Sequence, residues 1–343
     1  MPRHHQYHSS TRFTEPEGSV TARASAIGLI GALAIAASIL APVAQAALSS
    51  KPARTFVTNG RVEAVLPTPG AIYIGGSFTL VGPRTGPGVG IDSSTAKSTG
   101  LPEVSGGWQE LYAVTPDGSG GFYIGGDFTH VGGVVRHNLA HILANGSVDP
   151  NFNPNVHANA NVSVQALALS GSTVYAGGDF SSIGGRTRFS IAALGASSGA
   201  ATSWNPNLNS DSTVDALAVS GSTVYAGGGF RSVGGKTRHQ IAALDASSGT
   251  ATSWNPNANN IVHALAVSGS TVYAGGYLSS IGGKNRNQIA ALNATSGAAT
   301  SWNPNANGIV DTLAVGPDGS LWAGGSFTGF ARAPQSGIAR FKP

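Results

Sequence analysis

Short apolar runs separated by glycine, serine and asparagine fill the chain from about residue 60 onward. A representative stretch carries four such runs: Val214–Ser220 (VDALAVS), Ser222–Phe230 (STVYAGGGF), Gln240–Ala246 (QIAALDA) and Thr250–Pro256 (TATSWNP). The runs alternate or are wholly apolar, and they are rich in valine, alanine and aromatic residues, which is typical of β-strands. No helical period of apolar residues survives beyond residue 46. The pattern therefore predicts an all-β chain.

The four runs belong to a unit that repeats about every 50 residues. An aromatic-x-Gly-Gly element recurs six times, at Tyr73, Tyr123, Tyr175, Tyr225, Tyr273 and Trp322. Two copies, residues 164–209 and 214–259, match without gaps at 35 of 46 positions. Four strands in a unit of this length are typical of a propeller blade. We therefore predict a six-bladed β-propeller of four-stranded blades, in a single domain spanning residues 47–343. The predicted blades cover approximately residues 61–107, 108–160, 161–211, 212–260, 261–308 and 309–343.

The two ends of the repeated region complement each other. The last unit stops after its third strand-like run, Gly337–Lys342. Residues 54–65 align with the stretch around Trp254, and Phe56 takes the place of that tryptophan. We therefore predict that residues 53–58 form the closing strand of the last blade, which would hide the edge strands of the ring. A β-solenoid that does not close is the alternative, and it leaves this complementarity unexplained.

One unit resembles a known repeat. Residues 113–155 (AVTPDGSGGFYIGGDFTHVGGVVRHNLAHILANGSVDPNFNPN) are similar to the delta-60 β-propeller repeat of secreted bacterial proteins. The matching residues are Pro116-Asp117-Gly118, Gly125-Gly126-Asp127-Phe128, Gly132-Gly133, Arg136 and Asp149–Asn153. The resemblance covers nearly all of the chain after residue 46 and is weakest in the first unit. It implies a propeller fold and a secreted protein, and it implies no defined chemistry.

The first 46 residues have a different character. Arg23 is followed by an uncharged, largely apolar segment that ends in Ala44-Gln45-Ala46. A basic flank, an apolar core and a small-residue site predict a secretory signal peptide over residues 1–46, cleaved between Ala46 and Ala47. An uncleaved anchor is the alternative, and Val20 is a candidate for the true start of translation. We expect a protein that is secreted or held at the cell surface, with no membrane contact after cleavage.

Composition narrows the function. The chain has 343 residues, only 10% of them charged, and a formal net charge of +4. This weak field and the absence of a Lys/Arg run argue against a nucleic-acid partner. The chain contains no cysteine, so it has no disulfide, thiolate metal site or cysteine nucleophile. We expect a monomer without a cofactor.

Two glycines stand side by side in each strand-like run that follows the aromatic residue. Glycine within a strand costs roughly 0.5–1 kcal/mol relative to alanine, so a cost repeated six times needs a structural reason. We expect either a close approach between neighbouring blades or a bulge. Gly229–Thr237 is similar to a phosphate-binding loop, but its spacing is one residue too long and no helix follows it.

A basic residue also repeats. Arg136, Arg188, Arg238 and Arg286 hold one position in units two to five. Together with the nearby Trp204, Trp254 and Trp302, they would form a partial ring on one face that binds a glycan by bidentate hydrogen bonds and stacking. The alternative is structural. In that case each arginine binds carbonyl groups inside its own blade and each tryptophan packs between blades.

The start of the innermost strand varies between units. The six units carry Glu63, Glu110, Gln165, Asp215, His263 and Asp311 at this place. In a closed ring these side chains would surround one mouth of the central channel. They would bind a cation or another ligand, or hold acid–base partners with shifted pKa values. The alternative is a solvated polar rim.

No motif of a known catalytic class is present. Ala242–Trp254 is similar to the blade repeat of quinoprotein dehydrogenases, but the tryptophan comes one residue late. We predict a secreted, non-enzymatic β-propeller that binds or displays an extracellular glycan or protein ligand. The alternatives are an extracellular hydrolase or lyase that acts on a polymer through the channel-mouth carboxylates, and a purely structural module.

Overall fold

Antiparallel β-strands make up every regular element that the structure describes. The structure is a computed structural model, and it describes residues 61–67, 71–77, 88–92, 98–99, 102–108, 110–157, 162–331 and 333–343. All of them lie in one compact unit, Gln45–Pro343. The predicted signal peptide (1–46) and the predicted closing strand (53–58) lie outside the described residues. No helix in the described part is long and apolar enough to cross a membrane.

The main strands form six antiparallel sheets, each built from three consecutive long strands. The first strands are β1 (Arg61–Pro67), β6 (Glu110–Pro116), β11 (Ser163–Ser170), β16 (Ala216–Ser220), β21 (Val262–Ser268) and β26 (Val310–Val315). The second strands are β2 (Ala71–Ser77), β7 (Phe122–Asp127), β12 (Thr173–Asp179), β17 (Thr223–Gly227), β22 (Thr271–Gly276) and β27 (Leu321–Gly325). The third strands are β3 (Gly88–Asp92), β10 (Leu139–Ile142), β15 (Ile191–Gly195), β20 (Ile241–Asp245), β25 (Ile289–Asn293) and β30 (Ile338–Phe341).

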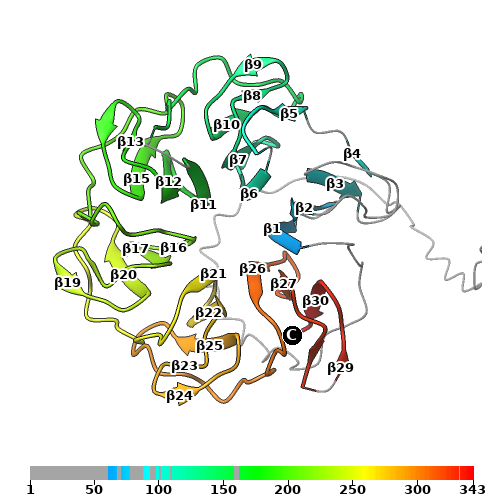
Figure 1. Cartoon of the computed structure of the whole chain (residues 1–343), viewed down its shortest axis with the longest axis vertical. Coiled ribbons are helices and arrows are strands. Elements are labelled where there is room, and N and C mark those ends of the chain that lie inside the picture. Colours follow the sequence, from blue (N-terminus) through cyan, green and yellow to red (C-terminus); the bar gives the residue numbers. More distant parts are fainter. Residues whose placement is uncertain are drawn as a thin grey trace, which may run out of the picture. The chain divides into compact units, whose positions relative to one another are not determined.

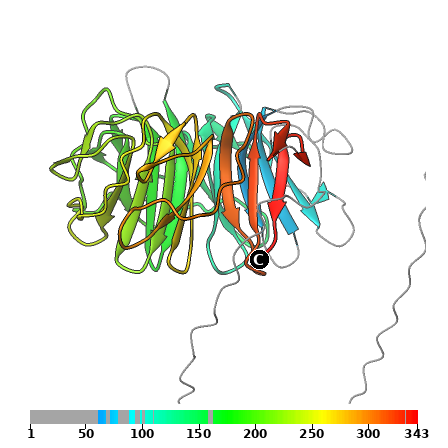
Figure 2. The same cartoon turned by 90° about the horizontal axis from the view of Figure 1, so that it is seen from below.

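The six sheets lie around a common centre, with their first strands innermost (Figure 1). Each first strand contacts the first strand of the next sheet, from β1 and β6 round to β21 and β26, and β26 in turn contacts β1. Seen from the side, the long strands run roughly along the central axis (Figure 2). This arrangement brings the corresponding ends of all six first strands together around the central axis.

The predicted fourth strand is mostly reduced to a single bridge. Ala201, Ala251 and Ala299 each bridge to the third strand of their sheet, and Val148 does the same in the second sheet. After this bridge the Trp-Asn-Pro-Asn sequence turns away. Proline has no N–H to donate to a ladder, and the second asparagine of the motif adopts a positive φ, as at Asn207 (φ 53°) and Asn257 (φ 53°). In the first sheet, β4 (Ser98–Thr99) pairs with β3 as a short fourth strand.

Small hairpins extend the loop between the second and third strands. Their two-residue strands are β8 (His130–Val131), β9 (Val134–Val135), β13 (Ser182–Ile183), β14 (Arg186–Thr187), β18 (Ser232–Val233), β19 (Lys236–Thr237), β23 (Ser280–Ile281), β24 (Lys284–Asn285), β28 (Gly329–Phe330) and β29 (Ala333–Pro334). In the second unit, β5 (Val104–Ser105) pairs with β8 and extends the small hairpin to three strands. Gly184 (φ 60°) and Gly185 (φ 79°) show why a glycine pair connects such a hairpin. A tight turn with two positive φ angles matches the twist of the strands.

The strand glycine pair allows the close approach between neighbouring sheets that the sequence predicts, and it also contacts the first strand of its own sheet. A β-carbon on Gly177 would lie 2.6 Å from Val214 Cγ1 of the next sheet, and one on Gly178 would lie 2.1 Å from the carbonyl oxygen of Ser163. The first glycine therefore allows neighbouring sheets to approach, and the second makes room for the backbone of the first strand. The same pairs of contacts recur in four other sheets, at Gly125 and Gly126, Gly227 and Gly228, Gly275 and Gly276, and Gly324 and Gly325.

The core lies between neighbouring sheets. Trp204, on the connection that leaves the third sheet, packs edge-on against Tyr175 with a centroid distance of 5.2 Å. Its Nε1 donates to the carbonyl of Asp245 in the fourth sheet (3.1 Å). Trp254 repeats this arrangement with Tyr225 and Asn293. The structure thus shows Trp204 and Trp254 as packing residues between sheets, the structural alternative considered above.

Candidate functional site

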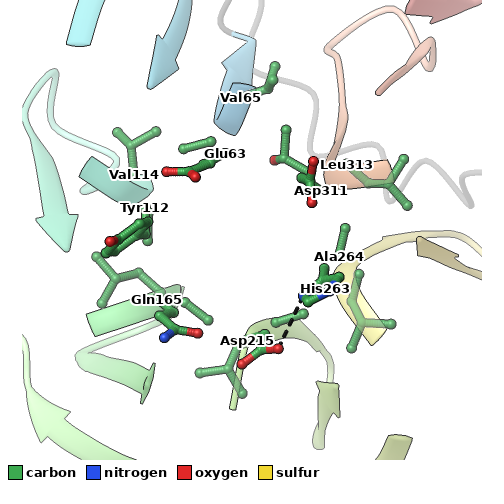
Figure 3. Close-up of a pocket in the computed structure, with 18 residues that line it drawn as sticks. Glu63, Val65, Tyr112, Val114, Gln165, Asp215, His263, Ala264, Asp311 and Leu313 are labelled. Atoms are coloured by element: carbon green, nitrogen blue, oxygen red, sulfur yellow. Dashed lines mark ion pairs between the residues drawn. The ribbon is translucent and has the colours of Figure 1, made fainter. Parts of the chain in front are cut away.

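An irregularity at one end of the first strands determines which side chains face the centre. In β11 the register changes from Val164 opposite Gly178 to Ala166 opposite Gly177, so Gln165 is an extra, bulged residue. The same bulge occurs at Glu63, Tyr112, His263 and Asp311, and Asp215 stands at the corresponding place just before β16. A bulge re-aims a side chain. These six side chains line a central cavity (Figure 3).

The sequence alignment of the second unit was wrong by two residues. Tyr112, not Glu110, is the bulged residue of β6, and Glu110 lies two positions earlier, opposite Asp127. Glu110 still lines the outer part of the cavity, and so does Arg61, which holds the same place on β1. Aligning Leu111-Tyr112-Ala113 with Val164-Gln165-Ala166 would have identified Tyr112, because both triplets precede an apolar residue.

The cavity has a polar outer part and apolar walls. The outer part has about 800 Å³ of free space, including solvent at its open end. It is lined by Arg61, Glu63, Glu110, Tyr112, Gln165, Asp215, His263 and Asp311. The inner part, with about 440 Å³ of free space that also includes open solvent, adds residues such as Ala166, Leu167, Ala216 and Leu217. The structure therefore places all six predicted channel-mouth residues around one cavity and adds Arg61 and Tyr112 to them.

Arg61 connects the first sheet to the last one. Its Nη2 donates to Asp311 Oδ1 (2.9 Å), and its Nη1 lies 3.6 Å from Glu63 Oε1. Burial disfavours the charge on Arg61, but the hydrogen bond and charge of Asp311, together with Glu63, outweigh it and raise the pKa of the guanidinium. The Asp311 side chain is only 2% exposed. Its second oxygen, Oδ2, has no hydrogen-bond partner among the described residues. A buried carboxylate oxygen without a partner is costly, so it is an unfilled acceptor position.

The other polar residues of the cavity also form pairs. His263 Nδ1 lies 3.2 Å from Asp215 Oδ2 of the neighbouring sheet. The Tyr112 hydroxyl donates to Glu110 Oε2. Burial, with Glu110 adding to it, raises the pKa of Tyr112, so the phenol stays protonated and remains a donor. Gln165 Nε2 donates to Ser163 Oγ (3.1 Å).

The charges of the cavity do not balance. Glu63, Glu110, Asp215 and Asp311 supply four carboxylates, whereas Arg61 and His263 are the basic groups of the lining. In the described residues no three His, Asp or Glu side chains converge closely enough to hold a metal ion. Three of the contacts described above pair a carboxylate with a guanidinium, an imidazole or a phenol.

The repeated arginines are structural anchors. Arg188 is buried, and it donates through Nη1 to the carbonyl of Thr187 (2.8 Å) and through Nη2 to that of Thr202 (2.7 Å). Arg136, Arg238 and Arg286 are equally buried and make the corresponding pair of bonds. Burial lowers the pKa of Arg188, and the nearby Arg186 lowers it further. Because their terminal nitrogens are bonded to carbonyl groups, we leave the four arginines out of the candidate site.

Comparison with known proteins agrees with this architecture. A family described as "Domain of unknown function (DUF5122) beta-propeller" matches residues 115–152. No curated protein gives a significant match. A chain of the mitotic checkpoint complex is similar over 94% of this chain and 99% of its own length, at 14% identity and a TM-score of 0.54. The U3-55K structure is similar over 84% and 98%, at 9% identity and a TM-score of 0.50.

The WD40 β-propeller domain of Doa1 is also similar, over 85% of this chain and 96% of that one, at 10% identity and a TM-score of 0.49. At such identities a structural likeness concerns the fold and not the function. The family match falls on the second sheet, and the sheets surround a common centre with their first strands innermost. The chain is therefore an all-β protein with a β-propeller fold.

Proposed function

We propose that this protein is a secreted, non-enzymatic β-propeller that binds an extracellular glycan or protein ligand at the outer part of the central cavity. The observation that carries the proposal is Asp311. Its carboxylate is nearly fully buried at the cavity wall, and its Oδ2 lacks a partner among the described residues. Asp311 belongs to the cavity lining, so a rotation of its carboxylate would bring this oxygen to a ligand that donates a hydrogen bond and satisfies it.

The lining favours a ligand group that is positively charged. Four carboxylates outnumber the basic groups Arg61 and His263, so a protonated amine would gain attraction in a partly buried site. Alanine and leucine side chains lie directly beyond the polar residues. They would contact the carbon skeleton that carries the amine. The ligand class is therefore an amine-bearing glycan or a basic segment of a protein.

We further propose that the six sheets are six blades of one closed, monomeric ring, related to the delta-60 repeat, and that residues 53–58 complete the last blade. Two observations support closure. A β-carbon on Gly324 would lie 2.7 Å from Val62 Cγ1, which is the contact that the other glycine pairs make with the next sheet. Val62, Val65 and Ile74 of the first sheet also share a core cluster with Trp322 and Ile338 of the last.

Deletion of residues 53–58 tests the closed ring. We expect the shortened protein to melt at a clearly lower temperature, because the last blade would lose its outer strand and expose an edge. A melting temperature equal to that of the full protein would contradict the closing strand.

Secretion and signal cleavage are tested separately. We expect the exported protein to begin at Ala47, as read by N-terminal sequencing, and retention of residues 1–46 would contradict cleavage.

Binding is tested with probes of defined charge. We expect glucosamine oligomers or lysine-rich peptides to bind the wild-type protein in calorimetry, more weakly at high salt, and their N-acetylated counterparts to bind poorly. Asp311→Asn should weaken binding about tenfold, a change of about 1.4 kcal/mol. The matched control is Asp211→Asn, which changes an exposed carboxylate outside the cavity lining. Equal affinity of Asp311→Asn and wild type, or no binding of any probe, would contradict the proposal.

A further inference from the structure

A second cavity opens beside the second sheet, apart from the central one. It is a surface cleft with about 1,030 Å³ of free space, including open solvent, and its lining includes Trp108, Asp127, Thr129, His137, Asn138 and His157. Trp108 follows β5, Asp127 ends β7, and His157 bridges to Ser182 of β13 in the third sheet. The lining of this cleft includes none of the repeated arginines and none of the polar residues that line the central cavity.

Trp108 differs from the other tryptophans because it is exposed to solvent. Its side chain is 77% exposed, whereas Trp204, Trp254 and Trp322 are buried and Trp302 is partly buried. An exposed tryptophan forgoes the large free energy of burial that its ring would gain in a core. At the edge of the cleft, this ring offers a flat apolar surface with a polar N–H, on which part of a ligand can stack.

The wall beside the indole is polar. Burial raises the pKa of Asp127, and the charge of Glu110 adds to this effect, while a hydrogen bond from the backbone N–H of Trp108 opposes it. The rings of His137 and His157 lie 6.2 Å apart. Within the described part of the chain neither imidazole has a hydrogen bond to another side chain or to the backbone. Donors and acceptors therefore line the cleft next to one flat apolar surface.

Two of these positions also vary between the units. His137 stands where Phe189, His239 and Asn287 follow the anchoring arginine of the other units. His157 donates its backbone N–H to the neighbouring small hairpin, as Asn259 and Asn307 do in later units. Asparagine occupies that place in those units, and only the second connection carries histidine there. A side chain that the scaffold does not require is free to serve a ligand.

We propose that this cleft binds a saccharide, with one sugar ring stacked on the indole of Trp108 and its hydroxyl groups hydrogen-bonded to Asp127 and to the imidazoles of His137 and His157. A pyranose has an apolar face of C–H groups and an edge of hydroxyl groups. It therefore matches one exposed aromatic plane beside a wall of donors and acceptors. A neutral sugar needs no charge of the central cavity, so this inference stands apart from the proposed amine site.

The fluorescence of Trp108 gives a direct test. Of the five tryptophans it is the most exposed, so it should account for most of the quenching by acrylamide. The probes are soluble hexasaccharides of glucose, N-acetylglucosamine, xylose and galacturonic acid. We expect at least one of them to protect Trp108 from quenching and to bind in calorimetry. Protection by none of the four would overturn the proposal.

Variants show whether the protection comes from this cleft. Trp108→Ala should weaken binding of the protecting saccharide at least about tenfold, and Trp108→Phe should retain part of the affinity because a smaller ring still stacks. Asp127→Asn should weaken binding about threefold or more. The matched control is Tyr277→Ala, which removes another exposed aromatic side chain (57% exposed) on the fifth sheet, outside the cleft.

Asp311→Asn, in the central cavity, should leave saccharide binding unchanged and so distinguish this cleft from the amine site. Circular dichroism verifies the folding of each variant. If Trp108→Ala fails to fold, Trp108→Phe and Asp127→Asn still decide. Wild-type affinity in both, or equal losses in Tyr277→Ala, would refute the saccharide cleft.

Discussion

Two sets of charged residues in this protein make different kinds of contact. The repeated arginines, for example Arg188 and Arg238, bind backbone carbonyl groups of their own sheet. The cavity residues instead pair side chain to side chain across sheets, as Arg61 does with Asp311 and Asp215 with His263. The arginines are identical in four units, whereas the cavity residues differ from unit to unit.

The comparison distinguishes residues that repeat because the fold needs them from residues that vary between the units. A residue that repeats with the blade meets the same need in each sheet, which is the satisfaction of buried carbonyl groups. A position that varies while its backbone environment stays constant is released from that need. The bulged residues of the central cavity and the two histidines of the cleft, His137 and His157, lie at such positions.

The glycine pair should give the largest effect on the scaffold side. Gly178→Ala would place a β-carbon 2.1 Å from the carbonyl oxygen of Ser163. Because that oxygen is backbone, the strand must shift, and we expect a loss of about 3–4 kcal/mol in the free energy of unfolding. Urea denaturation measures it. The control is Gly185→Ala, whose β-carbon would meet nothing within 4 Å and which bears only the strain of φ 79°. Equal losses in the two variants would contradict the steric role of Gly178.

Removal of an anchoring arginine should come next. Arg238→Ala deprives the carbonyl groups of Thr237 and Thr252 of their donors, and we expect a loss of about 2–3 kcal/mol in unfolding free energy. Arg238→Lys should recover part of it, because one ammonium replaces the two-pronged guanidinium. If Arg238→Ala instead abolished ligand binding without a loss of stability, the comparison between the two sets would be broken.

A buried cluster around His141 in the second sheet tests the distinction between repeated and varying residues. Its histidine is not repeated in the other units, yet its contacts are those of a structural cluster. His141 Nδ1 lies 2.8 Å from Asp149 Oδ2, its Nε2 lies 3.2 Å from Asp117 Oδ2, and its ring stacks on Tyr123 at 4.2 Å. Burial alone would raise the pKa of Asp149. The hydrogen bonds from His141 and the Asn151 N–H and the nearby charge of Arg136 outweigh burial and leave this pKa below its ordinary value of 3.8.

A lowered carboxyl pKa predicts a loss of stability in acid. The contribution of Asp149 is fully present above about pH 4 and disappears as the pH falls through the lowered folded-state pKa. We expect Asp149→Asn to lower the unfolding free energy at pH 6 by about 1 kcal/mol and to lose less of it than the wild type between pH 6 and pH 3. Urea denaturation at both values measures this, with Asp211→Asn as the control. An unchanged acid loss in Asp149→Asn would contradict the assignment.

The cavity side should show the smallest effect on stability. Asp311→Asn removes a buried charge whose Oδ2 has no partner among the described residues, and it weakens only a pair with a half-exposed arginine. We expect a change within about 1 kcal/mol in the free energy of unfolding, measured by urea denaturation. A loss as large as that of Arg238→Ala would place Asp311 with the scaffold residues and remove the ground for the ligand site.

Most of the fold could be predicted from the sequence because each unit repeats the same pattern of apolar residues and glycine pairs. The period of the glycine pairs and the alternation of the apolar runs predicted the three long strands of each sheet and the close approach of neighbouring sheets, which Gly177 shows. The fourth strand was predicted with less success. The apolar run ending in Trp254 is strand-like, but the following Asn255-Pro256 and the packing of the indole between sheets reduce it to the bridge at Ala251.

The candidate sites depended on tertiary structure. The sequence by itself determined that polar residues stand at the start of the first strands, and that they vary where glycine and arginine do not. Only the structure decided that Tyr112 and Arg61 line the cavity and that Glu110 lies one tier further out. The reason is the bulge. Side chains alternate between two directions along a strand, and one inserted residue, accommodated by a glycine on the neighbouring strand, changes which of them faces the centre.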